Sequence, residues 1–167
     1  MDENLLSLII PIFNEEENIK PLIEHIHSAL KGLSYEVILV DDCSTDSSVT
    51  NIQKLADPKV HLVQLKKNYG QSLALAAGFE VAQGVYLITM DGDLQNDASD
   101  IPAMLQKLQE EDWDVVTGIR QKRKDSVLKT FPSRIANFII RRTTKLNVKD
   151  QGCALKVFTR ETAKGLN

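Results

Sequence analysis

Cysteine is scarce and long apolar runs are absent, and both absences exclude whole classes of protein. Cys43 and Cys153 are the two cysteines in 167 residues and lie far apart, so neither a disulfide framework nor a zinc knuckle is indicated. No segment approaches the roughly eighteen uninterrupted apolar residues of a membrane-spanning helix. The acidic first residues lack the basic stretch that opens a signal peptide. We expect a single domain over residues 1–167 in a reducing, cytoplasmic environment.

Several common catalytic signatures are also missing. There is no G-x-x-x-x-G-K-[ST] loop, because the stretch "GQSLALAAG" (70–78) lacks the lysine, and this disfavours an NTPase. No G-x-G-x-x-G follows the first apolar run, which disfavours a nicotinamide enzyme. No Ser-His-Asp or Cys-His set can be assembled. The three histidines, His25, His27 and His61, are predicted to be structural.

Lysine and arginine are scarce in the first part of the chain and crowded later. Residues 1–117 carry 7 of them against 20 carboxylates, a balance of −13, whereas residues 118–149 carry 10 against Asp125 alone, a balance of +9. Such segregation usually means that one region meets an anion, although a solvated basic face has the same composition. Nucleic acid is disfavoured as that anion, because the only aromatic residues of the basic region, Phe131 and Phe138, fall in an apolar helix face.

That apolar face belongs to a helix predicted over residues 127–142. It forms an arc of roughly 120° on a helical wheel. Its members are Val127, Leu128, Phe131, Ile135, Phe138 and Ile139. Arg134 and Arg141 lie at the edge of the arc, which is the pattern of a helix at a lipid interface. A membrane surface that contacts the basic region 120–145 is one interpretation, and an amphipathic helix packed on its own sheet is the other.

Short apolar runs alternate with longer helical patterns along the chain. The expected strands are 5–13, 35–42, 60–65, 85–90, 113–119 and 153–158. The expected helices are 15–33, 44–56, 72–82, 100–111 and 127–142. Such alternation predicts an α/β fold in which helices cover both faces of a mainly parallel sheet.

Two of the expected strands end in carboxylates. Asp41 and Asp42 follow "VILV", and Asp91 and Asp93 follow "LITM". In open parallel sheets, ligands bind beyond the carboxyl ends of the strands. Two acidic strand ends therefore predict a binding site at that edge.

Asp91, Asp93 and Gln95 offer the hard oxygen donors that Mg²⁺ or Mn²⁺ prefers. Gly92 between the aspartates would let the chain turn closely against a ligand. A magnesium-type ion leaves room for substrate phosphates, so the lack of further acidic or histidine ligands nearby fits a diphosphate that completes the coordination sphere. An aspartyl phosphatase is disfavoured, because there the aspartate pair normally follows the first strand and is trailed by threonine rather than Leu94.

Five motifs in this order resemble inverting family 2 glycosyltransferases with the GT-A fold, a Rossmann-like three-layer sandwich. They are "PIFNEEENI" (11–19), "LVDDCSTDSS" (39–48), "KNYGQSLALAAGF" (67–79), "DGDLQND" (91–97) and "TGIRQKRKDS" (117–126). Within that family the chain most resembles the polyprenyl-phosphate glycosyltransferases, and among these the bacterial transferases that use 4-deoxy-4-formamido-arabinose. The resemblance covers nearly the whole chain.

The resemblance implies roles for the matching residues. The implied nucleotide-binding residues are Pro11, Phe13, Glu15, Asp41, Asp42, Gln71, Asp91 and Gly92. Asp42, with Asp41 as the alternative, would accept a hydrogen bond from the uracil ring. Gln71 stands where glucosyl and mannosyl relatives tend to have lysine.

The remaining implied roles concern the metal and the reaction. Asp93 and Gln95, with Asp91 beside them, would hold the Mg²⁺ or Mn²⁺ on the diphosphate. Arg120 would face the diphosphate or the acceptor phosphate. Asp150 matches the proposed catalytic base, although its role would be as much to position the acceptor as to deprotonate it.

The implied activity is metal-dependent, inverting transfer of a sugar from a UDP-sugar to a polyprenyl phosphate of the undecaprenyl type, for a cell-envelope glycan or lipid. Two alternatives stay open: a polysaccharide acceptor, and a nucleotide-sugar-binding fragment without activity. The resemblance implies that a longer protein would continue beyond Asn167 through an acceptor-loop region and C-terminal membrane helices. We expect this segment to be soluble and the longer protein to lie at the cytoplasmic face of the membrane. The sequence leaves open the sugar, UDP against GDP, Mg²⁺ against Mn²⁺, and whether homo-oligomers form.

Overall fold

The computed structural model of the chain describes residues 4–119 and 152–164. Four sequence-based predictions lie outside these residues: the roles of Arg120 and Asp150, the helix 127–142, and membrane contact by the region 120–145. They stay predictions.

The described residues form a six-stranded sheet with the strand order β3-β2-β1-β4-β6-β5. The strands are β1 (Leu6–Ile12), β2 (Tyr35–Asp41), β3 (Val60–Gln64), β4 (Tyr86–Thr89), β5 (Val115–Thr117) and β6 (Lys156–Thr159). Strands β1 to β4 pair in parallel, whereas β6 runs antiparallel to both β4 and β5. The predicted mainly parallel sheet is confirmed. The reversed direction of β6 is a new finding, because apolar periodicity does not encode the direction of a strand.

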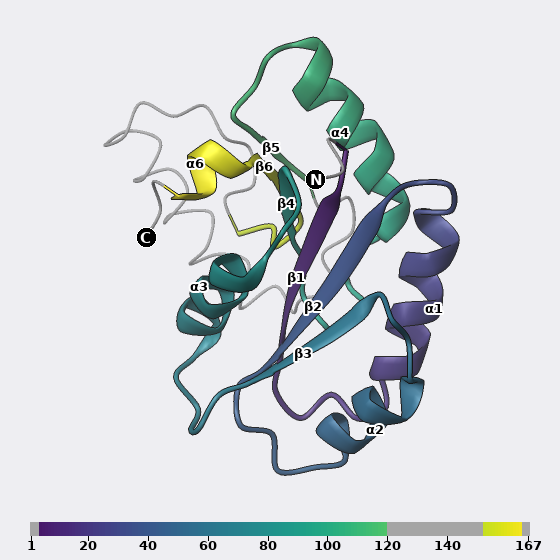
Figure 1. Cartoon of the computed structure of the whole chain (residues 1–167), viewed down its shortest axis with the longest axis vertical. Coiled ribbons are helices and arrows are strands. Elements are labelled where there is room, and N and C mark those ends of the chain that lie inside the picture. The colour runs from purple at the N-terminus through teal and green to yellow at the C-terminus, as the bar shows by residue number, and fades with distance from the viewer. Residues whose placement is uncertain (1–3, 120–151, 165–167) are drawn as a thin grey trace, which may run out of the picture.

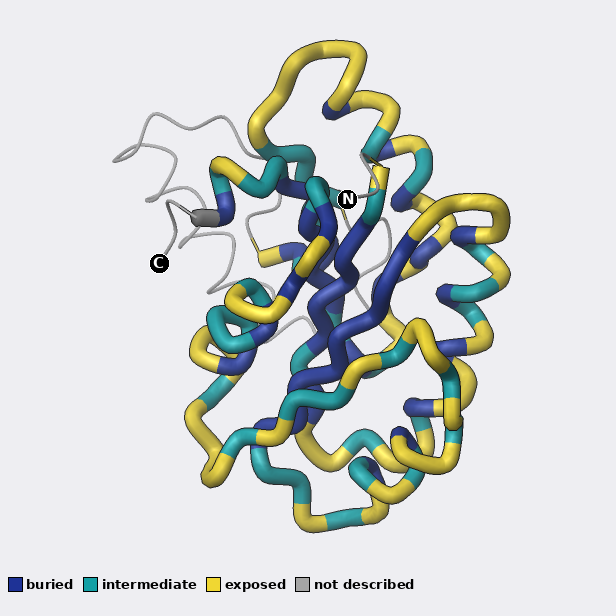
Figure 2. The backbone as a smooth tube through the Cα atoms, viewed as in Figure 1, coloured by how far each residue is buried: buried dark blue, intermediate teal, exposed yellow. Residues whose placement is uncertain are grey.

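The interior strands β1 and β2 are mostly apolar because both of their faces are covered. All seven residues of β2 and six of the seven in β1 are buried, whereas no residue of the edge strand β3 is fully buried. Figure 2 shows this gradient as a dark blue centre with a mixed edge. A continuous apolar run therefore marks an interior strand of a parallel sheet.

Helices cover both faces of this sheet, in three layers (Figure 1). One face carries α1 (Ile19–Ala29), α2 (Ser48–Leu55), the 3-10 turn η1 (Ala98–Asp100) and α4 (Ile101–Glu110). The other face carries α3 (Gln71–Val81) and α6 (Arg160–Lys164). The predicted α/β sandwich is confirmed.

The apolar periodicity of α1 explains how it packs. The apolar side chains that recur at helical spacing on one face of this segment are all buried: Ile19, Leu22, Ile23, Ile26 and Leu30. Burial of a residue of this kind contributes about 1.5–3 kcal/mol, so this face is sufficient to dock the helix.

Helix α3 packs closely because its side chains are small. A Cβ at Gly78 would lie 2.3 Å from Cγ2 of Ile9 and 3.1 Å from Cγ2 of Val40. No side chain fits there, so the glycine lets the helix backbone approach β1 and β2. This close approach sets the position of the first turn of α3, which contributes to the site.

The histidines contact carboxylates within the fold. Nε2 of His25 lies 3.0 Å from Asp97, Nε2 of His27 lies 2.5 Å from Asp57, and Nε2 of His61 lies 3.5 Å from Glu36. None of the three lines the cavities described below, in agreement with the structural role predicted for them. Within residues 4–119 and 152–164, no helix has both the length and the apolar content to cross a bilayer.

Candidate functional site

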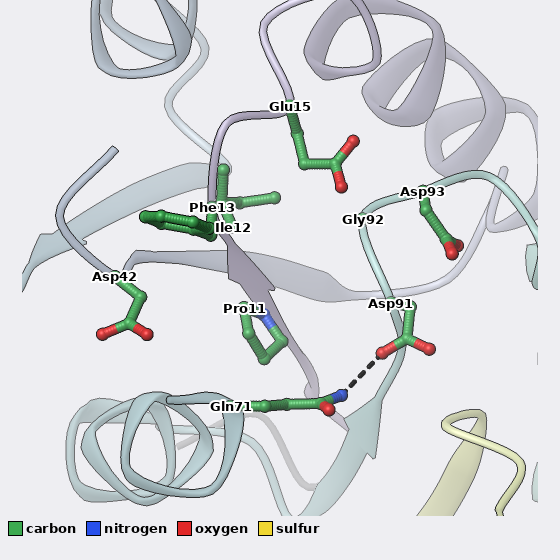
Figure 3. A pocket seen from close by; sticks show the side chains of 9 residues that line it. All are labelled: Pro11, Ile12, Phe13, Glu15, Asp42, Gln71, Asp91, Gly92 and Asp93. Carbon is green, nitrogen blue, oxygen red and sulfur yellow. Dashed lines mark hydrogen bonds between the residues drawn. The ribbon is translucent and has the colours of Figure 1, made fainter. Parts of the chain in front are cut away.

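A cavity of about 250 Å³ lies beyond the carboxyl ends of β1, β2 and β4. We call it the carboxylate cavity. It is lined by Pro11, Ile12, Phe13, Glu15, Asp42, Gln71, Asp91, Gly92 and Asp93. In Figure 3, Asp42 lies at one end, Asp91 and Asp93 lie at the other, and Pro11 lies between them. The fold thus brings together, at the predicted edge of the sheet, eight residues singled out from the sequence.

The backbone around this cavity adopts unusual conformations. Asn14, Cys43 and Leu94 have φ angles of 55°, 66° and 61°, and each follows a strand or the Asp-Gly-Asp turn that lines the cavity. They are three of five non-glycine residues with positive φ in the described part of the chain. Backbone strain of this kind clusters at functional sites. The concentration of positive-φ residues around the cavity therefore marks this edge of the sheet as a candidate functional site.

Hydrogen bonds tie the loop after β1 to the loop after β2. The N–H of Asn14 donates to Oγ of Ser44 over 2.9 Å, and the N–H of Thr45 donates to Oδ1 of Asn14 over 2.8 Å. The N–H of Glu15 donates to Oγ of Ser48 over 2.9 Å. The short polar residues of "CSTDSS" therefore hold Glu15 at the cavity.

Asp42 is held firmly by the chain. Its carboxylate accepts the N–H of Tyr69 over 2.7 Å and the N–H of Gly70 over 2.8 Å. Gly70 has a φ of 89°, which favours glycine. Asp41 instead accepts the N–H of Ser44 and does not line the cavity. Of the two aspartates that the sequence leaves open as the partner of the uracil ring, Asp42 is the one that lines the cavity.

Asp91 is oriented from two sides. Its Oδ1 accepts the side-chain amide of Gln71 over 2.7 Å, the bond drawn in Figure 3. Its N–H donates to Oδ1 of Asn96 over 3.1 Å, and Asn96 is buried. Sequence reasoning missed Asn96, although an asparagine that follows a turn in "DGDLQND" is typical of a turn-stabilising residue.

Gly92 has a reason to be glycine besides the expected close approach to a ligand. A Cβ there would lie 2.7 Å from Cδ1 of Ile12. The glycine therefore lets the Asp-Gly-Asp turn approach the end of β1, and Ile12 in turn lines the cavity. The turn is placed by protein packing in addition to any approach to a ligand.

Gln95 is not brought into the carboxylate cavity. Its N–H donates to Oδ1 of Asp93 over 3.0 Å, and the residue lines a separate cavity with Gly118 and Cys153. The expectation that Gln95 joins Asp93 assumed continued strand alternation. The positive φ of Leu94 turns the chain between them and breaks that alternation.

The carboxylate cavity is strongly negative. Four carboxylates line it, from Glu15, Asp42, Asp91 and Asp93, and none of its described lining residues is lysine or arginine. A diphosphate would be repelled unless a cation came with it. Residues 4–119 and 152–164 contain no cluster of three or more His, Cys, Asp or Glu side chains able to hold a metal ion. Two carboxylates at one end of a cavity nevertheless fit Mg²⁺ or Mn²⁺, which takes one or two carboxylates and completes its sphere with phosphates.

A second cavity, of about 270 Å³, adjoins the first. We call it the lysine cavity. Gln71 and Asp91 line both cavities, and Lys156 of β6 lines the second. Sequence reasoning missed Lys156, because only the antiparallel pairing of β6 with β4 brings it beside the Asp-Gly-Asp turn.

Comparison with known proteins gives these residues a family context. A family model described as Glycosyl transferase family 2 matches residues 7–166. The chain is 42% identical over 159 residues to the dodecaprenyl-phosphate galacturonate synthase of Rhizobium johnstonii, covering 92% of this chain and 47% of that protein. It is 38% identical over 168 residues to the undecaprenyl-phosphate 4-deoxy-4-formamido-L-arabinose transferase of Shewanella sediminis, covering 98% and 50%. The chain spans about half the length of the curated relatives it matches.

Solved structures share the arrangement of helices and strands. The mannosyltransferase PcManGT of Pyrobaculum calidifontis, in complex with GDP-Man and Mn²⁺, matches with a TM-score of 0.71 and 22% identity, over 97% of this chain and 46% of that chain. Glucosyl-3-phosphoglycerate synthase of Mycobacterium tuberculosis, in complex with Mn²⁺, UDP-glucose and phosphoglyceric acid, matches with a TM-score of 0.75 and 20% identity, over 95% and 57%. At these identities the likeness shows the fold alone, and that fold is the predicted GT-A fold.

Proposed function

This chain belongs to glycosyl transferase family 2, and from that membership we propose that it transfers a sugar from a nucleotide sugar, with UDP as the nucleotide, to a polyprenyl phosphate. The observation that carries the proposal is the layout of the carboxylate cavity, with Asp42 at one end and Asp91 and Asp93 at the other. The names of the relatives from Rhizobium johnstonii and Shewanella sediminis support the acceptor class.

The Asp42 end suits the uracil ring. Each carboxylate oxygen of Asp42 accepts one backbone N–H and keeps a further lone pair, which can accept the ring N–H of uracil. Phe13 lines the same cavity and is 46% exposed, so its ring offers an apolar surface to the base. Because Asp42 is fixed by the chain, it would bind the base without reorganisation.

The opposite end suits the diphosphate. Asp91 and Asp93 would hold Mg²⁺ or Mn²⁺ against the diphosphate oxygens, and Gln71 would keep the Asp91 carboxylate in one orientation. The ion, when bound, stabilises the negative charge that develops on the departing nucleotide. The GT-A structures from Pyrobaculum calidifontis and Mycobacterium tuberculosis were solved with Mn²⁺, which fits the donor set of this cavity.

The reaction needs little general-base catalysis. An oxygen of the acceptor phosphate forms a bond to the anomeric carbon of the sugar, while the bond from that carbon to the diphosphate oxygen breaks and its electron pair stays with the nucleotide. A phosphate monoester has a second pKa of about 6 and is largely dianionic at neutral pH. Asp150 would therefore position the acceptor as much as take a proton from it, and Arg120 would stabilise the diphosphate.

A transfer assay tests this proposal. The chain is incubated with UDP- or GDP-linked sugars, with Mn²⁺ or with a chelator, and with a short-chain polyprenyl monophosphate or the matching polyprenol. We expect nucleotide release that requires a UDP-sugar, a divalent ion and the phosphate acceptor together. Use of GDP-sugars alone would overturn the uridine assignment. Binding of UDP-sugars without transfer to any acceptor would favour the inactive binding fragment.

A further inference from the structure

The lysine cavity opens beside the end of the carboxylate cavity that we assign to the diphosphate. The two share Gln71 and Asp91, whose side chains are joined by the 2.7 Å hydrogen bond. A group held in the lysine cavity therefore lies next to the point where the leaving diphosphate would be. The second substrate of a transfer reaction has to bind within reach of the sugar attached to that diphosphate, and a cavity adjoining the donor site is within such reach.

Charge distinguishes the two cavities. Among the described residues that line either of them, Lys156 is the one that carries a positive charge. An acceptor dianion that approaches the sugar meets the field of the carboxylates of Asp91 and Asp93, which disfavours binding. The cation proposed for the diphosphate compensates the donor, so the acceptor needs a positive group of its own.

The position of Lys156 follows from the sheet. β6 runs antiparallel to β4, and Lys156 is paired with Thr89, two residues before Asp91. The Nζ of Lys156 donates to the carbonyl oxygen of Cys153. The hydroxyl of Thr89 donates to the carbonyl oxygen of Ala154 over 2.7 Å. The Thr89 bond holds the segment before β6 against β4, and the local Lys156 bond fixes the ammonium group beside that segment.

The rest of the wall is amphipathic. Leu75, Met90 and Ala154 supply apolar surface, and Gln71 and Ser72 at the start of α3 supply polar groups. Asp91, shared with the donor site, is the one carboxylate of the described wall. With that carboxylate assigned to the metal ion, a cation, a few hydrogen-bonding groups and apolar flanks suit a phosphate attached to an apolar chain. Lysine, as a compact point charge with three donors, is a common phosphate ligand.

We propose that the lysine cavity binds the phosphate of the acceptor and that Lys156 is its binding residue. This inference rests on the proposed function and deepens it, because it assigns the acceptor phosphate a binding site separate from that of the nucleotide sugar. Lys156 would neutralise part of the acceptor dianion next to the acidic donor site and hold it near the anomeric carbon. The lysine takes no part in bond formation.

The test is a binding measurement that does not require turnover. A short-chain polyprenyl monophosphate, kept below its micelle concentration, is titrated calorimetrically into the chain in the presence of UDP and Mn²⁺. Lys156→Met should weaken phosphate binding by about ten- to a hundredfold, the range expected for loss of a charge-assisted hydrogen bond, and should leave UDP binding unchanged. Lys156→Arg should recover most of the affinity. The matching polyprenol should bind parent and Lys156→Met equally.

Lys20→Met is the matched control. It removes the same charge from an exposed side chain of α1, on the other face of the sheet, where Lys20 lies 3.8 Å from Glu24. If this control loses as much phosphate affinity as Lys156→Met does, the effect comes from the net charge of the chain and not from the lysine cavity, and the proposal is overturned. It is also overturned by unchanged affinity in Lys156→Met, an equal loss of UDP affinity, or a parent chain that does not bind the monophosphate.

Two measurements keep the test decisive if Lys156→Met does not fold, which circular dichroism would reveal. Lys156→Arg must then retain binding, and the affinity of the parent chain for the monophosphate must fall as added salt screens the charges. A salt-independent affinity would contradict a role for the lysine charge. Failure of UDP to bind the parent chain with Mn²⁺ would instead count against the proposed function, so the two failures are distinguishable.

Discussion

The Asp-Gly-Asp turn is placed by the contact between Gly92 and Ile12, and replacing Gly92 with alanine tests that. The added Cβ would lie 2.7 Å from Cδ1 of Ile12 and 3.4 Å from the carbonyl oxygen of Pro11. The first distance is shorter than a carbon–carbon contact allows, so the buried side chain of Ile12 has to shift from its packed position. Overpacking of this kind costs about 1–3 kcal/mol. We expect Gly92→Ala to lower the free energy of unfolding by that amount and to weaken UDP binding in the presence of Mn²⁺.

A second change isolates the clash. Ile12→Val removes Cδ1 and alone should cost about 0.5–1.5 kcal/mol. Combined with Gly92→Ala it removes the atom that the new methyl group would meet, so the double variant should be more stable than the sum of the single costs predicts. Urea unfolding of the parent, both single variants and the double variant measures this coupling. If the losses of stability in the two single variants add up to the loss in the double variant within about 0.5 kcal/mol, the two side chains do not compete for space. That result would refute the reasoning.

Two further predictions concern aspartates held by backbone N–H groups. Asp42→Ala leaves the N–H groups of Tyr69 and Gly70 without their acceptor, so urea unfolding should show a loss of about 1–3 kcal/mol. UDP should also bind more weakly than in an Asp112→Asn control, which removes a carboxylate between α4 and β5. Asp97 accepts the N–H of Ser99, and this bond, with the Ser99 hydroxyl and His25, holds the pKa of Asp97 below its ordinary value. The contribution of the ionised Asp97 carboxylate to folding stability is therefore present above pH ~4 and is lost as the pH falls through the lowered pKa. Unfolding measured against pH should show a shallower acid dependence in Asp97→Asn than in the parent, and an unchanged dependence would contradict this account.

Several features of the fold follow directly from the residues. The face of α1 that carries Ile19 and Ile26 was predictable because a period of about 3.6 residues has one structural meaning. The position of the site was predictable as well, because carboxylates such as Asp42 and Asp91 come at the ends of apolar strands, and parallel strands end at one edge.

Other features depend on contacts between distant parts of the chain, and the local pattern does not contain them. Lys156 reaches the site through the antiparallel pairing of β6 with β4, across 67 positions between Thr89 and Lys156. Gln95 lines a separate cavity because Leu94 adopts a positive φ, which leucine rarely does. Gly92 has to be glycine because a Cβ at this turn position would meet Ile12 at the end of β1. For Lys156 and Gly92 the deciding partner lies outside the motif, whereas for Gln95 it is the backbone conformation of the adjacent Leu94.

The central claim is that a divalent cation held by Asp91 and Asp93 binds the diphosphate. Calorimetric titration of UDP into the chain, with Mn²⁺ and with a chelator, tests it in the parent, in Asp93→Ala, and in Asp112→Asn as a charge-matched control in the loop between α4 and β5. We predict that chelation and Asp93→Ala each weaken UDP binding by at least about tenfold, the effect of about 1.4 kcal/mol, and that Asp112→Asn binds as the parent does. UDP that binds equally tightly without any divalent ion and without the Asp93 carboxylate would contradict the account.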